Sequence, residues 1–207
     1  MNKTLLKERI IQQASEMFSL HGVKRVSMDE LASNLGISKR TIYGAFNSKE
    51  DVLRSCINSF QESKRQNISE IINNSENIIH GYMQVIDYYK YTRLPESILW
   101  EDIYKYYPEM YKCILKNAEK NRNYFKQLLK EGIKDNYLRE DLHFDGIVYM
   151  LDISTFMINS GIPSVRASYL RTDLIFNIMV NMLRGVSTTK GSEIIDKYIA
   201  DLPHSNN

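Results

Sequence analysis

The sequence predicts an all-α protein with an N-terminal three-helix domain and a larger C-terminal helical domain. Apolar residues recur three and four positions apart along most of the 207 residues, which is the period of amphipathic helices. No stretch shows the clear alternation of a half-buried strand, and only 9 Gly and 4 Pro interrupt the chain. A hydrophobic content of 43% is enough for a sizeable core. The pattern divides into about nine or ten helices.

The stretch SMDELASNLGISKRTIYGAFNSKED organises the N-terminal domain. It begins with Ser27, and Glu30 follows at the spacing of a capping box, so a helix starts directly after the serine. Gly36 ends this helix, because glycine adopts the left-handed conformation without a Cβ penalty. Ser38 caps a second short helix, expected over residues 39–46. Two short helices joined by a glycine-containing turn are the layout of a helix-turn-helix.

The second helix of this motif begins with cations on its exposed face. Ile42 and Phe46 are four residues apart and are expected to be buried, which leaves Lys39 and Arg40 outside. A helix N-terminus favours acidic side chains, so two cations in the first turn suit a bound polyanion. We therefore predict DNA binding, with Arg40 pairing with guanine and Lys39 contacting guanine or a phosphate.

At these residues the sequence resembles the TetR family of bacterial transcriptional regulators. The resemblance covers about the first quarter of the chain and includes the ending Tyr-x-x-Phe-x-x-Lys-Glu at residues 43–50. It implies an all-helical dimer whose N-terminal domain binds a palindromic double-stranded DNA operator. It also implies a C-terminal domain that binds a small ligand and so releases the DNA. The matching residues are Ile11, Ala14, Phe18, Gly22, Ser27, Leu31, Ala32, Gly36, Ser38, Tyr43, Phe46 and Lys49.

Further DNA contacts follow partly from residue chemistry and partly from this resemblance. Thr41 suits the methyl group of thymine, and Ser27 suits a phosphate at a helix N-terminus. The resemblance implies a phosphate contact for Tyr43 and a DNA-backbone contact for Lys49. Gly44 has two readings, since it either permits a closer approach of the DNA backbone or removes a contact. The complete predicted set is Ser27, Ser38, Lys39, Arg40, Thr41, Tyr43, Gly44 and Lys49.

The chain divides into a DNA-binding domain over residues 1–50 and an effector-binding and dimerisation domain over residues 68–202. A linking helix over residues 49–67 joins them, and its polar run at 62–66 is interpreted as a solvated turn. Residues 203–207 are expected to be disordered. The other expected helices cover residues 7–20, 28–35, 76–91, 95–106, 108–133, 145–160, 166–186 and 192–200.

Two C-terminal helices predict a dimer interface. The helix over 145–160 is apolar nearly all round, so it must be covered on both sides. One protomer has too few remaining elements to cover it together with the helix over 166–186. Pairing with a second copy would form a two-fold four-helix interface, and the alternative is a wholly internal helix. The proposed interface residues are Met150, Met157, Leu174, Ile178 and Met182.

An aromatic cluster is the candidate for a small-molecule effector pocket. Eight of the 14 tyrosines fall between Tyr82 and Tyr111, together with the only tryptophan. Aromatic side chains with a polar tip suit a flat, partly apolar ligand, and the alternative is a mixture of core and surface residues. Nearby acids such as Asp87 and Asp102 either favour a cationic effector or are solvated. The candidate pocket residues are Met83, Trp100, Tyr104 and Phe156.

Other classes of function find little support in the sequence. The four histidines are scattered, and no zinc-protease, nucleophile-elbow or phosphate-loop motif is present, so neither an enzyme nor a cofactor is predicted. The start of the chain lacks a signal peptide, and no stretch approaches the roughly 20 apolar residues of a membrane span. We expect a cytoplasmic, ligand-released repressor without a membrane partner. The alternative is a helical protein-binding adaptor that kept the fold without DNA binding.

Overall fold

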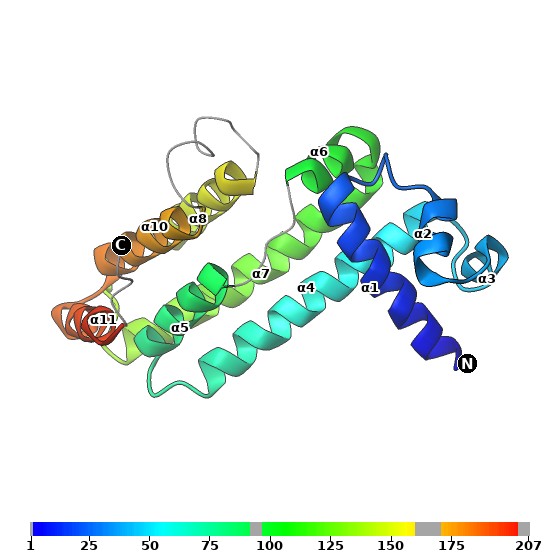
Figure 1. The fold of residues 1–207 in the computed structure, drawn as a ribbon. Helices are drawn as coiled ribbons and strands as arrows, with labels where there is room; N and C mark the ends of the chain where they lie inside the picture. Colours follow the sequence, from blue (N-terminus) through cyan, green and yellow to red (C-terminus); the bar gives the residue numbers. More distant parts are fainter. Residues whose placement is uncertain (1, 92–96, 160–170, 203–207) are drawn as a thin grey trace. The chain divides into compact units, whose positions relative to one another are not determined.

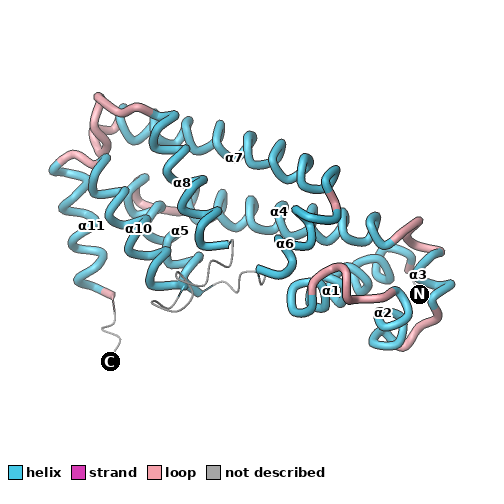
Figure 2. Tube along the Cα trace, turned by 90° about the horizontal axis from the view of Figure 1, so that it is seen from above, coloured by secondary structure: helices cyan, strands magenta, loops and turns pink. Residues whose placement is uncertain are grey.

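The computed structural model describes residues 2–91, 97–159 and 171–202, and these residues confirm the all-α fold (Figure 1). Ten helices lie within them, and the only β-type pairing there is an isolated antiparallel bridge between Leu138 and Ser187. Figure 2 shows the same helices as a tube, with short connections between most of them. Residues 95–96, 160 and 166–170 of the predicted helices lie outside the described residues, and so does the tail at 203–207 that is expected to be disordered.

The chain forms two compact units. The first unit comprises Met1–Gln66 and Leu94–Leu115, and the second comprises Asn67–Arg93 and Lys116–Asn207. The chain therefore leaves the first unit, returns to it and leaves it again. The first unit contains α1 (Lys3–His21), α2 (Met28–Leu35), α3 (Lys39–Tyr43), most of α4 (Lys49–Asn73), α6 (Ser97–Tyr106) and the start of α7 (Pro108–Lys134). The second contains α5 (Ile78–Tyr91), α8 (Phe144–Asn159), α10 (Arg171–Val186), α11 (Thr189–Asp201) and the remainder of α4 and α7.

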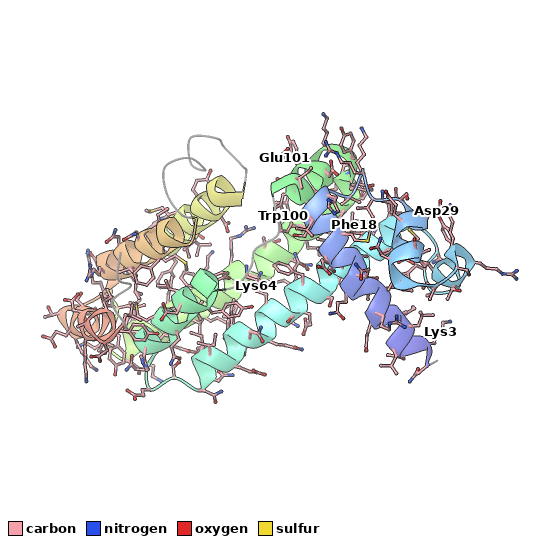
Figure 3. The ribbon with its side chains drawn as sticks, viewed as in Figure 1. Lys3, Phe18, Asp29, Lys64, Trp100 and Glu101 are labelled. Carbon is pink, nitrogen blue, oxygen red and sulfur yellow. The ribbon has the colours of Figure 1, made fainter. Side chains whose placement is uncertain are left out.

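The core of the first unit joins four helices of the N-terminal region to α6. Phe18 of α1, Leu31 of α2 and Ile42 of α3 are buried together, as their spacing in the sequence predicts. Leu99 and Ile103 of α6 are buried in the same cluster, although their place in the sequence, within residues 68–202, predicts that they belong to the C-terminal domain. Figure 3 labels Phe18 of this cluster on α1, and Trp100 on α6, which packs against the cluster.

The core of the second unit is built mainly by α5, α7, α10 and α11. Ile79 and Met83 of α5 are fully buried, and Val180 and Leu183 of α10 pack into the same cluster with Ile195 of α11. Ile79 and Met83, one helical turn apart on α5, thus share one buried face, which is the helical pattern expected of a core element.

Some predicted boundaries are wrong. The first helix begins at Lys3 rather than residue 7, because the side chain of Asn2 accepts a hydrogen bond from the N–H of Thr4 at 3.1 Å and caps it. Helix α3 ends at Tyr43 rather than at residue 46. The polar run at 62–66 is not a turn, because α4 continues through it to Asn73. Within that run, Glu62 accepts hydrogen bonds from Arg65 and Gln66, at the i+3 and i+4 spacings that stabilise a helix.

Candidate nucleic-acid interface

The start of α2 is fixed by a reciprocal cap. The N–H of Glu30 donates to Ser27 Oγ at 3.1 Å, and the N–H of Ser27 donates to Glu30 Oε2 at 2.7 Å, which confirms the predicted capping box. These bonds to the backbone and hydroxyl of Ser27 lower the pKa of the Glu30 carboxyl. Gly36 follows α2 with a φ of 66°, in the left-handed region expected for a helix-ending glycine.

The turn into α3 is closed by a second cap. The N–H of Thr41 donates to Ser38 Oγ at 3.1 Å, and the two hydroxyl groups lie 2.8 Å apart. Ile42 is fully buried and Phe46 nearly so, which anchors the inner face of α3 and the turn after it. The buried positions therefore orient Lys39, Arg40 and the residues after them as predicted from the sequence.

The two cations at the start of α3 differ in their surroundings. Lys39 Nζ lies 2.7 Å from Asp29 Oδ2 of α2, and this hydrogen-bonded ion pair raises the pKa of Lys39. Figure 3 labels Asp29 on α2. Arg40 is exposed, and its guanidinium group makes no hydrogen bond or ion pair within the part of the chain that the structure describes. Its guanidinium group is thus available to a partner without breaking an internal bond.

The rest of the outer face of α3 is small and aromatic. Tyr43 is 45% exposed, and Gly44 lies directly after it on the surface. Gly44 has an ordinary right-handed conformation, with a φ of −72° and a ψ of −19°. A Cβ atom at this position would meet its nearest neighbour, the carbonyl oxygen of Thr41, at 3.4 Å, which is normal contact. Neither the backbone nor its neighbours therefore require glycine here.

The other predicted DNA-contacting residues have internal partners as well. Ser27, Ser38 and Thr41 use their hydroxyl groups in the two caps described above. Lys49 opens α4 and is only half-exposed, and burial lowers its pKa. The carboxylates of Asp102 and Glu30 act on Lys49 in the opposite direction. Lys49 thus lies in the field of two carboxylates of its own unit, which the sequence pattern did not indicate.

The candidate effector-pocket residues divide between the two units. Met83 is fully buried in the core of the second unit, whereas Trp100 packs against the core of the first. Tyr104 is 67% exposed and its ring contacts Tyr111 edge-to-face at 5.2 Å. Phe156 lies on α8, and its side chain is outside the described residues. Two buried donors in this aromatic region, Trp100 Nε1 and the Tyr82 hydroxyl, have no hydrogen-bond partner among the residues described.

The candidate interface residues on α8 and α10 are placed in part. Met150 is 59% exposed beside Tyr149, which is 66% exposed, so α8 carries large apolar side chains on its surface. Ile178 and Met182 of α10 are half-buried. The side chains of Met157 and Leu174 lie outside the described residues.

The described ranges contain neither a candidate metal site nor a candidate membrane span. No group of three His, Cys, Asp or Glu side chains with the geometry to bind a metal ion occurs there. Among the same residues, no helix has both the length and the apolar character that crossing a bilayer requires.

Residues 10–56, which include α2 and α3, match the family model for bacterial regulatory proteins of the tetR family. The uncharacterised HTH-type transcriptional regulator YezE of Bacillus subtilis is 29% identical over 69 residues, which cover 33% of this chain and 36% of the relative. This chain therefore spans little more than a third of that relative in the alignment. The family-model match at residues 10–56 falls short of the whole chain but includes the complete helix-turn-helix.

Solved structures are similar over most of the chain. A transcriptional regulator from Saccharomonospora viridis, in complex with choline, has a TM-score of 0.77 at 14% identity and covers 89% of this chain and 99% of its own. The regulator FadR from Bacillus subtilis, in complex with stearoyl-CoA, has a TM-score of 0.67 at 20% identity, with coverages of 86% and 98%. At these identities the likeness shows a shared fold.

Proposed function

Because this chain belongs to the tetR family of bacterial regulatory proteins and is a helix-turn-helix transcriptional regulator, we propose that it is a repressor that a small ligand releases from DNA. It binds a palindromic operator as a dimer. In each protomer α3 enters the major groove, and α2 lies across the phosphate backbone with Ser27 at its N-terminus.

The observation that carries this proposal is the exposed guanidinium group of Arg40 in the first turn of α3. An arginine fork donates two parallel hydrogen bonds to O6 and N7 of guanine, which distinguishes this base from the others. Ser38 caps the helix and Ile42 anchors it, so the start of α3 has a defined geometry. Lys39, Thr41, Tyr43 and Lys49 supply the remaining predicted contacts to bases and phosphates.

A dimer is supported by the apolar side chains on the surface of α8. Tyr149 and Met150 are exposed in the single chain, and an apolar surface of this kind is typical of a protein interface. We propose that it pairs with the α8 and α10 helices of a second copy. A two-fold dimer presents two α3 helices to half-sites roughly 34–36 Å apart, or a multiple of that spacing.

The second unit is proposed to bind the ligand, with Met83 and its neighbour Tyr82 as the first residues to test. Tyr82 is 7% exposed, and its hydroxyl group has no hydrogen-bond partner among the described residues. Buried polar groups in proteins normally have a partner, so a ligand hydrogen-bonded here would satisfy this group. A ligand that binds better to the conformation with low DNA affinity releases the operator by that difference in affinity.

The test is selection of bound duplexes from a random DNA pool by the full chain. The proposal predicts enrichment of one sequence with two inverted half-sites whose centres are about 10 base pairs, or a multiple, apart. Failure to enrich any sequence at low salt would overturn it and leave the protein-binding adaptor as the better reading. Enrichment of a single, unrepeated half-site would overturn the dimeric form of the proposal.

A further inference from the structure

We infer that Asp102 of α6 is a positioning residue for DNA binding, an inference that rests on the proposed function. Its carboxylate fixes the α1–α2 loop (residues 22–27), and this loop ends at the cap of α2. Asp102 belongs to the first unit with the helix-turn-helix, and it is separated by 78 residues in sequence from the backbone group it binds. The inference concerns geometry, since no DNA contact is assigned to Asp102 itself.

The first observation is a hydrogen bond to the loop backbone. The N–H of Lys24 donates to Asp102 Oδ2 at 2.7 Å, a distance typical of a bond to a charged acceptor. Val23 and Val26, which flank Lys24 and Arg25, are buried in the core of the unit. The backbone between these two anchors turns outward, and the Asp102 carboxylate binds the N–H that this turn would otherwise leave to water.

The second observation is the space made for this carboxylate. Gly22 has a φ of 79°, which favours glycine, and a Cβ atom there would lie 2.6 Å from Asp102 Oδ2 and 3.0 Å from Cγ1 of Ile98. Any larger residue would displace the carboxylate as well as straining the backbone. The close approach of α6 to the loop therefore depends on both Gly22 and Asp102.

The third observation is a second contact between α6 and the same loop residue. The Nζ atom of Lys24 lies 3.3 Å from the hydroxyl group of Tyr106 and 4.3 Å from the centre of its ring. Lys24 is thus bound to α6 through both its backbone and its side chain. Asp102 and Tyr106 are one helical turn apart, so they present both groups from one side of α6.

The consequence concerns α2 and α3. Residue 27, which follows the buried Val26, caps α2 through the capping box, and α3 packs against α2. Lys49, at the start of α4, also lies in the field of Asp102. One carboxylate thus binds the loop and acts on the start of α4. Its removal frees the loop and, with it, the proposed phosphate contact at Ser27.

Two substitutions separate the hydrogen bond from the charge. Asp102→Ala removes both, whereas Asp102→Asn keeps a carbonyl oxygen that accepts from the Lys24 N–H. We expect Asp102→Ala to weaken binding to the selected operator about tenfold, and Asp102→Asn to stay within about threefold of wild type. Affinity for a scrambled duplex is expected to be unchanged or higher in both variants, because each loses a negative charge near a polyanion.

These expected changes in affinity distinguish a positioning role of Asp102 from a purely electrostatic effect and from a general loss of stability. Removing a negative charge alone would strengthen DNA binding, so a loss confined to the operator requires a change in geometry. The affinities are measured well below the melting temperature of each variant. Gly22→Ala is the second variant, for the case that Asp102→Ala does not fold. It is expected to lower operator affinity in the same way, because its methyl group displaces the carboxylate.

The inference is overturned if Asp102→Ala binds the operator like wild type, or if Asp102→Asn loses as much affinity as Asp102→Ala. A folded Gly22→Ala variant with wild-type operator affinity would overturn it equally. In these cases the wild-type chain still selects an operator, so the proposed function stands. If wild type selects no DNA, the proposed function fails first.

Discussion

Lys39 and Arg40 are adjacent cations, but only the side chain of Lys39 is paired with another residue of the described chain before DNA binds. Lys39 is paired with Asp29 across the helix-turn-helix, with the two side chains 47% and 70% exposed. An exposed pair of this kind is screened by water and contributes little to stability, so DNA can exchange it for a phosphate contact at small cost. Arg40 breaks no ion pair among the described residues when it binds. For this reason we assign base recognition to Arg40 and a weaker contribution to Lys39.

The first prediction tests this assignment by Arg40→Ala. A bidentate arginine–guanine pair discriminates by about 1–3 kcal/mol, so we expect operator affinity to fall about fivefold to 150-fold and base preference to relax at one position per half-site. Fluorescence anisotropy with single-base operator variants measures both effects. Lys112→Ala is the control, because Lys112 is an exposed cation paired with Glu109 on α7. Equal effects of the two substitutions would remove Arg40 from the site.

At the residue scale, the caps and the buried face were predictable, and the ion pairs were not. Each cap joins residues within five positions of one another, so the local sequence contains both partners of its hydrogen bonds. The capping residues are Ser27, Glu30, Gly36 and Ser38. The pairing of Lys39 with Asp29 depends on how two helices cross. Lys49 shows the same limit, since the field of Asp102 on it arises from a residue 53 positions further along the chain.

At the element scale, α2 is stabilised at its N-terminus by a charged cap. The lowered pKa of Glu30 means that its ionised carboxylate is more stable in the folded chain than in the unfolded chain. This contribution is fully present above the ordinary pKa of 4.5. It is lost as the pH falls from there through the lower pKa of the folded state.

The second prediction is the pH dependence of Glu30→Gln. Glutamine keeps a hydrogen-bonding side chain at this position but never carries the charge, so we expect the variant to melt below wild type at pH 7. The difference in melting temperature should shrink as the pH falls below 4.5. Thermal unfolding by circular dichroism at several pH values measures it. A difference that stays constant down to pH 2 would exclude a role for the ionised carboxylate.

The polar middle of α4 is helical although it has no apolar periodicity. Residues 62–66 contain no apolar side chain, which favours a turn, yet α4 passes through them as a regular helix. The Glu62–Arg65 ion pair and the Glu62–Gln66 hydrogen bond lie along this exposed stretch. Apolar periodicity reports burial, so an exposed helical turn between two buried segments has no such signal.

The third prediction is that Ser63→Pro destabilises the chain strongly. Ser63 is exposed in the middle of α4, where proline removes a backbone hydrogen bond and clashes with the preceding turn. We expect a loss of about 3 kcal/mol or more in the free energy of unfolding, measured by urea denaturation. Ser63→Ala is the matched control and should be neutral or slightly stabilising. A turn at this place would tolerate both.

At the scale of the whole molecule, the fold class and the helix-turn-helix followed from sequence, whereas the grouping of α6 did not. Leu99 and Ile103 have the spacing of any buried helix, so the pattern shows that α6 is buried but not against which core. The same reason explains why Met83 and Trp100 belong to different cores although both fall in the tyrosine-rich stretch. Pairing of distant helices is a tertiary property that local periodicity does not contain.

The fourth prediction concerns assembly. The wild-type chain should sediment as a dimer of about 48 kDa, twice its 24.2 kDa. Met150→Glu places a charge on the proposed α8 interface and is expected to shift the protein toward monomer and to weaken operator binding. Leu115→Glu is the matched control, since Leu115 is 48% exposed on α7, outside the proposed interface. Analytical ultracentrifugation distinguishes the species, and a monomeric wild type contradicts the assembly.

The central claim is that this chain recognises a particular DNA sequence through α3. The most direct measurement is the ratio of its dissociation constants for the selected duplex and for a scrambled duplex of the same composition, at one fixed salt concentration near 150 mM. Specific regulators typically bind their sites at least about 10³-fold more tightly than other DNA, and we predict a ratio of that order. A ratio close to one, with both affinities falling equally as salt rises, would mean that only the phosphates are recognised and would contradict the claim.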